Sequence, residues 1–447
     1  MTRAPREATL DRWLAWLFPL YALPLAIALA LITPPFQNPD EENHLLRAVE
    51  IAGGELVGRR FDAQGSGGKV DPAVNEADAE LGLIAGNQTA RLKPGVLERA
   101  DRVKWSGQRV DEVFYNTVLW SPVLYLPQAA AVRVGQALDW SVTDTLRLVR
   151  IVNAVLCVAI GTAGLLLWPA GRALLFTALC FPMALSMYAS AAHDGLMITG
   201  SVLALALLTR ASKAAILGGS LLHGVIAIGR PAYAPIALLA LLRRPASPVR
   251  WLGVGVAALC LAVWMPFLIA VRVELAHDGL VVDAGLQLAH LIAHPGVIPV
   301  IAFETLRAHL IDYGVMYIGV LGSLDTVLPR PYHYVARAIL LLALATEAIG
   351  PGNASRRDRV LLLIVLLAAS GAIFASQYLS WTAVDALVID GVQGRYFLPL
   401  TPAAALMIAG LARRRPRLRA AALIAIALFP LLTAAVVPGA VIARYTG

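Results

Sequence analysis

The chain has 447 residues, of which 58% are hydrophobic and only 15% charged, and its mean hydropathy is +0.70. Soluble domains average about 45–50% apolar and about 25% charged residues, so this composition excludes a soluble domain, a disordered chain and a coiled coil. The net charge of +8 does not indicate a nucleic-acid binder, because most basic residues stand in short runs between apolar stretches, as in loops that face a negative cytoplasmic leaflet. We expect an all-α, polytopic integral membrane protein.

Residues 1–33 are expected to form a cytoplasmic N-terminus and the first transmembrane helix. The apolar stretch 13–33 follows several arginines, is longer than the core of a signal peptide, and lacks a convincing cleavage site. We therefore expect this helix to stay uncleaved, with its N-terminus in the cytoplasm.

The next unit, residues 34–145, is predicted to be a large extracytoplasmic loop. Residues 34–144 hold 16 of the 29 acidic residues of the chain but only 11 of the 37 basic ones. Apolar residues recur at helical spacing after His44, which predicts amphipathic helices that lie on the membrane surface.

The remainder is predicted to hold transmembrane helices 2–7 in residues 146–271, a second extracytoplasmic loop with a re-entrant segment in 272–333, and helices 8–11 in 334–447. A membrane crossing needs about 20 apolar residues, so the stretch 232–242 is the weakest candidate. The eleven predicted spans are 13–33, 146–168, 173–191, 196–208, 214–228, 232–242, 251–271, 334–349, 360–379, 396–411 and 420–442.

Two further apolar segments, 118–138 and 297–321, either cross the membrane or lie at its outer interface, because proline, glycine or charge interrupts both. If neither crosses, the basic clusters between the spans all face the cytoplasm, as the positive-inside rule requires. We therefore expect eleven spans, an outer C-terminus and a bacterial cytoplasmic (inner) membrane location. This topology also brings distant ionisable residues to one outer mouth of the bundle: Asp40, Glu41, His44, His193, Asp194, Arg230, Asp390 and Arg395.

The first candidate group is Asp40, Glu41 and His44, where His44 lies one helical turn after the acidic pair. A carboxylate at the bilayer edge is partly desolvated, which improves it as a general base. The structural alternative is that Asp40 caps a helix and Glu41 complements its dipole. His193 and Asp194 form a second group in a tight outer turn, where Asp194 either takes part in function or caps the next helix.

The segment 393–399 places Arg395 where a predicted span begins, so its guanidinium and the helix N-terminus together predict a phosphate site. Gly394 allows a close backbone approach there. The alternative is an interfacial arginine that snorkels, with Tyr396 in the aromatic belt. Arg230 interrupts an apolar run at the outer end of a helix, and an isolated arginine there is a functional candidate.

The motifs Pro39-Asp40-Glu41 with His44, and Gln393 to Pro399, resemble those of a bacterial family of predicted membrane proteins of unknown function. The resemblance covers residues 34–402. That family in turn is similar to the GT-C superfamily of polyprenyl-phosphate-sugar-dependent glycosyltransferases, which share an acidic pair in the first outer loop, a proline-aromatic stretch (here 121–127) and an arginine in the next span (here within 146–153).

The resemblance implies catalytic acids and a basic face that holds a lipid-linked phosphate. Asp40 would be the base, Glu41 a weaker candidate, and Asp194 an assisting acid. His44 lies farther from the acidic pair than the histidine of protein O-mannosyltransferases does. The residues expected to bind substrate are His44, His193, Arg230, Gln393, Arg395 and Tyr396.

The expected activity is transfer of a sugar from a polyprenyl-phosphate donor to a glycan or lipid acceptor of the cell envelope, on the extracytoplasmic side and with inversion. The expected partners are donor, acceptor and lipid bilayer, without nucleic acid. No metal ligands are predicted, although converging acids and phosphate are compatible with a divalent cation. The alternative function is a transporter or flippase for a lipid-linked saccharide, since the short, proline-broken stretch 232–242 beside Arg230 fits a discontinuous helix at a substrate site.

Overall fold

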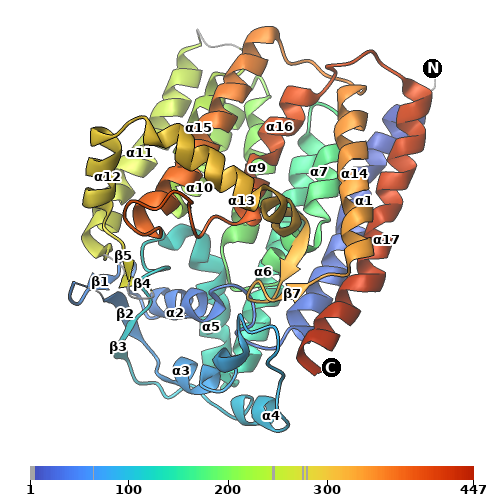
Figure 1. The fold of residues 1–447 in the computed structure, drawn as a ribbon. Coiled ribbons are helices and arrows are strands. Elements are labelled where there is room, and N and C mark those ends of the chain that lie inside the picture. Colours follow the sequence, from blue (N-terminus) through green and yellow to red (C-terminus); the bar gives the residue numbers. More distant parts are fainter. Residues whose placement is uncertain (1–5, 64, 244–246, 274–275, 278–279, 447) are drawn as a thin grey trace.

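The computed structural model describes residues 6–63, 65–243, 247–273, 276–277 and 280–446. Helices run side by side as an upright bundle, and the first loop covers its lower end (Figure 1). The structure confirms a mostly helical membrane protein. It corrects the all-α prediction only by adding short strands.

Within the described residues, five helices are long and apolar enough to cross a membrane. A sixth candidate is the pair α12 (Ala284–Ala293) and α13 (Val297–Gly319), which is bent by 116° at the break between them. These five or six candidates are fewer than the eleven spans expected from the sequence. The five are α1 (Arg6–Ile32), α6 (Val142–Leu167), α11 (Pro248–Val271), α15 (Arg356–Ser380) and α17 (Pro416–Thr446).

Most other apolar stretches form short helices inside the bundle. Proline explains two of the breaks, because it lacks an N–H and favours the first turn of a helix: Pro182 starts a new helix, and Pro231 and Pro235 lie in a 3₁₀ helix. These stretches are apolar largely because protein surrounds them. The elements are α7 (Ala173–Leu179), α8 (Pro182–Tyr188), α9 (Asp194–Leu208), α10 (Lys213–Gly229), η3 (Pro231–Leu241), η4 (Gly394–Leu400) and α16 (Thr401–Ile408). α14 (Arg330–Ala348) is longer, with 19 residues, and most of its side chains are not buried.

The apolar segment 118–138 becomes η2 (Pro122–Tyr125) and α5 (Leu126–Ala137). Twelve α-helical residues extend about 18 Å, well short of the roughly 30 Å hydrocarbon layer. α5 packs against α2 and α6. Its length and packing therefore agree with a surface position rather than a membrane crossing.

The first loop folds into short helices around a three-stranded antiparallel sheet of order β1-β2-β3. The glycine-containing segment 66–70 forms β2, where Gly67 stands opposite Arg59 and Val113. The loop elements are α2 (Glu41–Ala52), β1 (Arg59–Arg60), β2 (Ser66–Val70), α3 (Ala73–Asp78), η1 (Gly82–Ile84), α4 (Val96–Ala100) and β3 (Val110–Val113). Four further strands form two hairpins, β4 (Ala276–His277) with β5 (Leu280–Val281) and β6 (Val320–Leu321) with β7 (Thr326–Val327).

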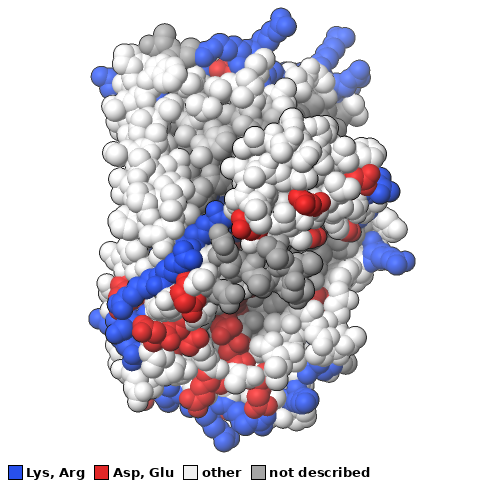
Figure 2. Space-filling view, turned by 60° about the vertical axis from the view of Figure 1, so that its left-hand side comes forward, with Lys and Arg blue, Asp and Glu red and all other residues white. Residues whose placement is uncertain are grey.

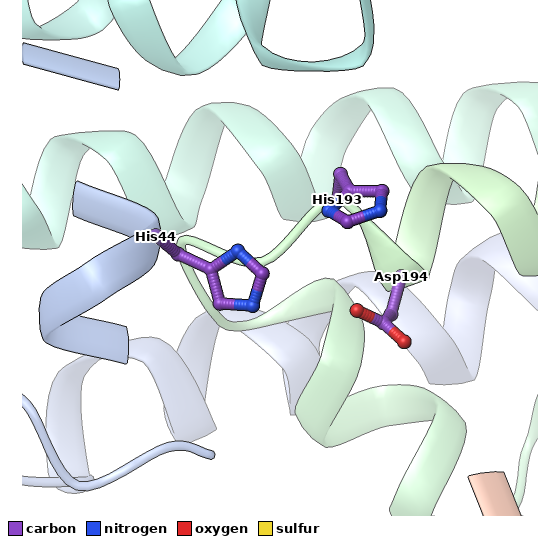
Figure 3. A group of neighbouring side chains, drawn as sticks. All are labelled: His44, His193 and Asp194. Carbon is purple, nitrogen blue, oxygen red and sulfur yellow. The ribbon is translucent and has the colours of Figure 1, made fainter. Parts of the chain in front are cut away.

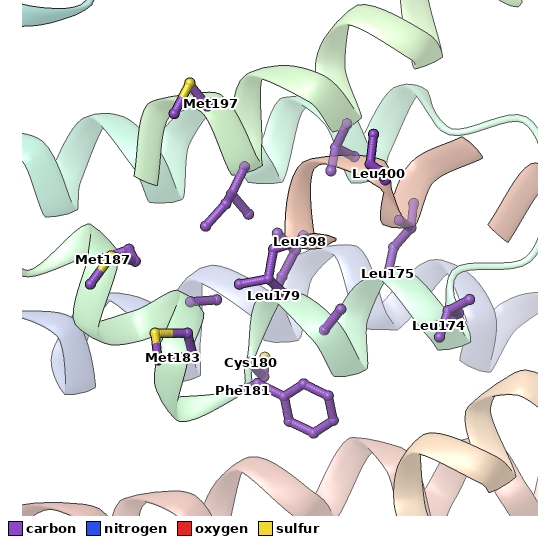
Figure 4. Packing of buried hydrophobic residues seen from close by; sticks show 14 of the residues in the cluster. Leu174, Leu175, Leu179, Cys180, Phe181, Met183, Met187, Met197, Leu398 and Leu400 are labelled. Atoms are coloured by element: carbon purple, nitrogen blue, oxygen red, sulfur yellow. The ribbon is translucent and has the colours of Figure 1, made fainter. Parts of the chain in front are cut away.

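Two apolar cores hold these parts together. The large core fills the bundle, where side chains of α7 and α8 such as Leu179 and Met187 pack beside Leu398 of η4 (Figure 4). A smaller core joins α2 to α6 through residues such as Leu45 and Leu146. Each fully buried leucine contributes about 1.5–3 kcal/mol, so the first loop is fixed firmly to the bundle.

The two ends of the bundle differ in charge. The N-terminal end and the start of α17 lie at the upper end, whereas the first loop and the C-terminal end of α17 lie at the lower end (Figure 1). Acidic side chains gather on the lower half of the molecule, and basic ones are prominent at its top (Figure 2).

Candidate functional site

A buried ion pair between Glu41 and Arg150 fixes the start of α2 to α6. Arg150 Nε donates to Glu41 Oε1 at 2.8 Å, Nη2 contacts Oε2, and both side chains are fully buried. Arg150 also donates to the backbone carbonyls of Ala30, Thr33 and Pro34 at the end of α1. The pair therefore joins α1, α2 and α6 at one point.

Both oxygens of the Glu41 carboxylate accept hydrogen bonds from other groups in this arrangement. Asn38 Nδ2 and the backbone N–H of Ala191 also donate to it, at 3.0 and 3.2 Å. Burial alone would raise the pKa of Glu41, but the charge and hydrogen bonds of Arg150 lower it below the usual range. The sequence named Glu41 as a catalytic acid; the structure instead gives it a place in the framework that presents Asp40.

Asp40 stands at the N-cap position of α2 in a left-handed conformation, with φ 55°, and makes no capping hydrogen bond. The structural alternative thus holds for the positions of Asp40 and of Glu41 in the first turn, but the side chain of Asp40 forms no cap hydrogen bond. Its side chain is 48% exposed, so the expected desolvation is only partial. Asn116 Nδ2 donates to Asp40 Oδ1 at 3.2 Å, and Arg395 Nη2 lies 3.6 Å from Oδ2. Asp40 and Arg395, 355 positions apart, thus meet as the predicted topology requires.

Two arginines flank the ring of Tyr396. The guanidinium carbon of Arg230 lies 4.1 Å from the ring centroid and that of Arg395 lies 5.6 Å from it. Tyr233 donates to the backbone carbonyl of Tyr396 at 2.7 Å, which fixes this segment. Cation–π contacts of this kind hold the two like charges close together.

Both guanidiniums keep unused hydrogen-bonding capacity. Asp194 Oδ1 lies 3.5 Å from Arg230 Nη2, and Arg395 Nη1 donates to the sulfur of Met187 at 3.7 Å. In the described part of the chain, Arg230 Nη1 and Arg395 Nε are buried without a hydrogen-bond partner. A buried donor without a partner costs about 1–3 kcal/mol, so the site is suited to an anion that accepts these bonds.

The structure corrects the prediction that a long helix begins at Arg395. The residue lies in η4, a 3₁₀ helix of seven residues, before α16 begins at Thr401. Gly394 has a packing role, because a Cβ there would clash with the backbone of Tyr313 and Tyr317 in α13. The anion site therefore depends on the two guanidiniums.

The hydroxyl of Tyr125 bridges the two histidines of the site. It lies 2.7 Å from Nδ1 of His44 and 2.9 Å from Nδ1 of His193, and Figure 3 shows the two rings beside Asp194. His193 Nε2 lies 3.3 Å from the carbonyl of Gly229. Because a carbonyl only accepts, Nε2 of neutral His193 carries the proton, Tyr125 donates to His193, and His44 donates to Tyr125. This polarity leaves His44 Nε2 as an acceptor.

His44, His193 and Asp194 also approach the arrangement of a metal site, since potential ligand atoms lie within 4.8 Å of one another. Two features disfavour a divalent cation. The hydroxyl of Tyr125 already binds Nδ1 of both histidines, and Arg230 lies beside the carboxylate. These residues fit a dication poorly, and we assign no metal to them.

A pocket of about 620 Å³ opens beside Asp40. Its walls come from the start of α2, from α3 and η1, from the turn at Ser323 and Leu324, and from Gln393. Thus Gln393, which was expected to bind substrate, lines this pocket.

One wall of this pocket is held from the far end of the chain. Arg444 in α17 pairs with Asp325 at 2.6 Å and donates to the backbone carbonyls of Ile84 and Asn87. Asp325 in turn accepts from the N–H of Gly86, which lines the pocket.

Sequence reasoning gave no role to Arg150, Tyr125, Asp78 or Asn116. Two of them carried a signal: Arg150 is an ionisable residue inside an apolar span, and Tyr125 lies in the proline-aromatic stretch 121–127. The partners of Asp78 and Asn116 are set by the fold of the first loop, which no local pattern reveals.

This fold and site define a mostly helical membrane protein with a charge-paired polar site at one end of its bundle. The chain belongs to DUF2142, a family of predicted membrane proteins, whose family model matches residues 23–404. No curated protein and no solved structure matches the chain.

Proposed function

We propose that the protein is a GT-C-type glycosyltransferase that moves a sugar from a polyprenyl-phosphate donor to a glycan or lipid acceptor. One observation carries the proposal: the half-exposed carboxylate of Asp40 lies 3.6 Å from Arg395, which together with Arg230 flanks Tyr396. A base therefore stands beside the buried cation of Arg395, and Arg230 lies on the same tyrosine ring, an arrangement suited to transfer from a phosphate-linked sugar.

Asp40 takes the proton from an acceptor hydroxyl in this mechanism. The oxygen attacks the anomeric carbon while the bond from that carbon to the phosphate oxygen breaks, and the phosphate leaves with the electron pair. Arg395 and Arg230 stabilise the charge that develops on the phosphate. A single displacement of this kind inverts the anomeric configuration.

Donor binding also releases the base. The guanidinium of Arg395 contacts Asp40 only at 3.6 Å, beyond normal hydrogen-bond length. A bound phosphate competes for this guanidinium, which leaves the carboxylate of Asp40 available to the acceptor.

The other predicted site residues act by positioning these groups. Asp194 holds Arg230, Glu41 fixes the helix start that presents Asp40, and Tyr125 orients His44. The acceptor nitrogen of His44 suits a hydroxyl of the donor sugar. Burial, together with the positive charges of Arg395 and Arg230, lowers the pKa of His44 to about 4, against the opposing effect of Asp194, so this imidazole stays neutral.

The proposal includes an extracytoplasmic site in a bacterial cytoplasmic membrane and eleven crossings, some made by short helices. The basic run at 413–419 starts α17 at the end of the bundle opposite the first loop, which agrees with a cytoplasmic upper end. Single cysteines at the exposed positions Leu83 and Arg415 test this orientation in intact cells. An impermeant maleimide should label position 83 only, and the reverse pattern contradicts the outer site.

Substitution of Asp40 tests the mechanism. Asp40→Asn should lower the transfer rate about 10²–10⁴-fold, the usual contribution of a general base, with unchanged membrane insertion. Transfer is measured with a radiolabelled polyprenyl-phosphate sugar and membranes that contain the acceptor. Asp139→Asn is the matched control, because the side chain of Asp139 is 87% exposed in the same loop. Full activity of Asp40→Asn would remove the residue from the mechanism.

A transporter or flippase for a lipid-linked saccharide is the second candidate. The observation in its favour is the 3₁₀ helix η3, which follows Arg230 directly and resembles the broken helices at transporter substrate sites. Donor breakdown separates the two: a glycosyltransferase releases polyprenyl phosphate, whereas a transporter returns the donor intact on the other side.

A further inference from the structure

The pocket beside Asp40 has a distinctive set of lining residues. Four carboxylates line it, Asp40, Glu41, Glu42 and Asp78, and no lysine or arginine is among its described lining residues. Arg150 already balances the charge of Glu41. The lining of the pocket is thus acidic, whereas the proposed donor site next to Asp40 contains two arginines.

Three of the described residues that line this pocket carry buried hydrogen-bond acceptors without partners. Among the described residues, Asp78 Oδ1, Asn75 Oδ1 and Gln393 Oε1 are buried without a hydrogen bond, and all three residues line the pocket. Asp78 is only 8% exposed. The two amide oxygens can only accept hydrogen bonds, and so can Asp78 Oδ1 when it carries no proton. A complementary ligand must therefore bring several O–H or N–H donors.

Asp78 and Glu42 lie close enough to share one proton. Burial and the neighbouring charge of Glu42, with which it hydrogen bonds, raise the pKa of Asp78 to about 8. Burial also raises the pKa of Glu42. The pair therefore keeps a proton at neutral pH, and the pocket presents less negative charge than its four carboxylates suggest.

We propose that this pocket is the acceptor subsite and that it takes a neutral, hydroxyl-rich saccharide. The role as acceptor subsite rests on the proposed glycosyl transfer. The preference for a neutral saccharide rests only on the residues that line the pocket. A saccharide supplies many O–H donors to the unpaired oxygens, and a hydroxyl placed in the pocket comes within reach of Asp40, which lines it.

Acidic saccharides fit this pocket poorly. A uronate or phosphate group would stand beside Asp40 and the proton-sharing pair without any lysine or arginine in the described lining. Like charges at such distances repel, and a desolvated anion without a partner is costly. The pocket consequently selects against the charge that the donor site attracts.

Direct binding tests the chemistry without any turnover. The full chain in lipid nanodiscs is titrated with neutral trisaccharides (maltotriose, mannotriose and chitotriose), with trigalacturonate, and with MgCl₂ and MnCl₂, and binding is followed by calorimetry. We expect at least one neutral trisaccharide to bind, and trigalacturonate to bind at least tenfold more weakly. Binding of no neutral trisaccharide, equal binding of trigalacturonate, or saturable binding of the cations alone would overturn the proposal.

A blocking substitution places the saccharide in this pocket. Ala79 lines the pocket and its side chain is exposed, so Ala79→Trp should fill the space and weaken the neutral trisaccharide at least tenfold. Ala63→Trp is the matched control, because Ala63 is exposed in the same loop and does not line the pocket. Equal affinity of the two variants would overturn the location.

The same variant separates this inference from the proposed function. If wild-type membranes release polyprenyl phosphate but Ala79→Trp transfers sugar at the normal rate, the acceptor subsite is wrong and the transferase stands. If the trisaccharide binds and Ala79→Trp abolishes its binding while no donor is consumed, the pocket is a saccharide site and the transferase proposal fails.

Discussion

Two buried groups of charged side chains lie toward opposite ends of the bundle, and they differ in how tightly they are paired. Near the upper end, Asp11 of α1 accepts from Arg172 at 2.9 Å and also binds Arg419 of α17. In the candidate site at the lower end, the separations are longer, 3.5 Å for Asp194 with Arg230 and 3.6 Å for Asp40 with Arg395.

The difference separates a structural role from a functional one. The pair of Asp11 with Arg172 has normal hydrogen-bond length, and with Arg419 it ties three parts of the chain together. Among the described residues, Arg230 Nη1 and Arg395 Nε are buried without a hydrogen-bond partner, as is Nε of the structural Arg444. The longer ion pairs therefore mark the site, and we attribute them to the binding of a ligand.

Neutralising Asp11, the shared partner of Arg172 and Arg419, should have the largest effect on stability. Asp11→Asn leaves Arg172 and Arg419 without their shared charge, and breaking a buried pair in this way costs about 3–5 kcal/mol. Unfolding in mixed micelles with increasing SDS measures the loss. Arg12→Gln, at an exposed neighbouring position, should change stability by about 0.5 kcal/mol or less. Equal stability of the two variants would contradict the structural role.

Titration of His44 in the candidate site should have a smaller effect on stability than the loss of Asp11. The pKa of His44 is about 4 in the folded protein against about 6.5 unfolded, so the unfolded chain binds the extra proton between these values. The stability contribution is complete above pH 6.5 and falls as the pH drops toward 4, by about 3 kcal/mol in total. His44→Gln should flatten this part of the profile measured by SDS unfolding. An unchanged profile would show that His44 is not held neutral.

Substitution of a site arginine should reduce activity more than stability. Arg395→Gln removes a charge-assisted contact worth about 1.5–3 kcal/mol, which corresponds to a loss of about 10–150-fold in kcat/KM for the donor. Arg395→Lys should restore part of the rate, because it keeps the charge but not the planar donor geometry. Donor titrations in membranes measure both variants. If Arg395→Gln were strongly destabilised but kept normal kinetics, Arg395 would have a structural role like that of Arg172.

The sequence predicted the meeting of Asp40 with Arg395 because both stand at the ends of apolar stretches, and such ends collect at one membrane face. It did not reveal the buried pairing of Glu41, whose partner Arg150 lies 109 positions away and could not be recognised from local pattern. Local pattern therefore did not show that the Glu41 carboxylate is buried and paired while that of Asp40 is half exposed.

The count of eleven spans stays a proposal, because only five or six helices among the described residues are long and apolar enough to stand out as crossings. Hydropathy does not distinguish a helix surrounded by lipid from one surrounded by protein, and α9 is almost wholly buried inside the bundle. Pro182 and the prolines of η3 marked breaks that length alone did not resolve. The small sheet of the first loop includes the glycine-containing segment 66–70, which has little strand propensity.

The contacts of Arg444 have a consequence for engineering. Because this side chain near the end of α17 ties down the backbone at Ile84 and Asn87, the shape of the pocket depends on a segment about 360 positions downstream. A chimera that takes only its first loop from a related sequence keeps this clamp only where the grafted backbone places the same carbonyls within reach of Arg444. Grafts intended to reshape the pocket are therefore better made by exchanging the loop and the last turn of α17 together.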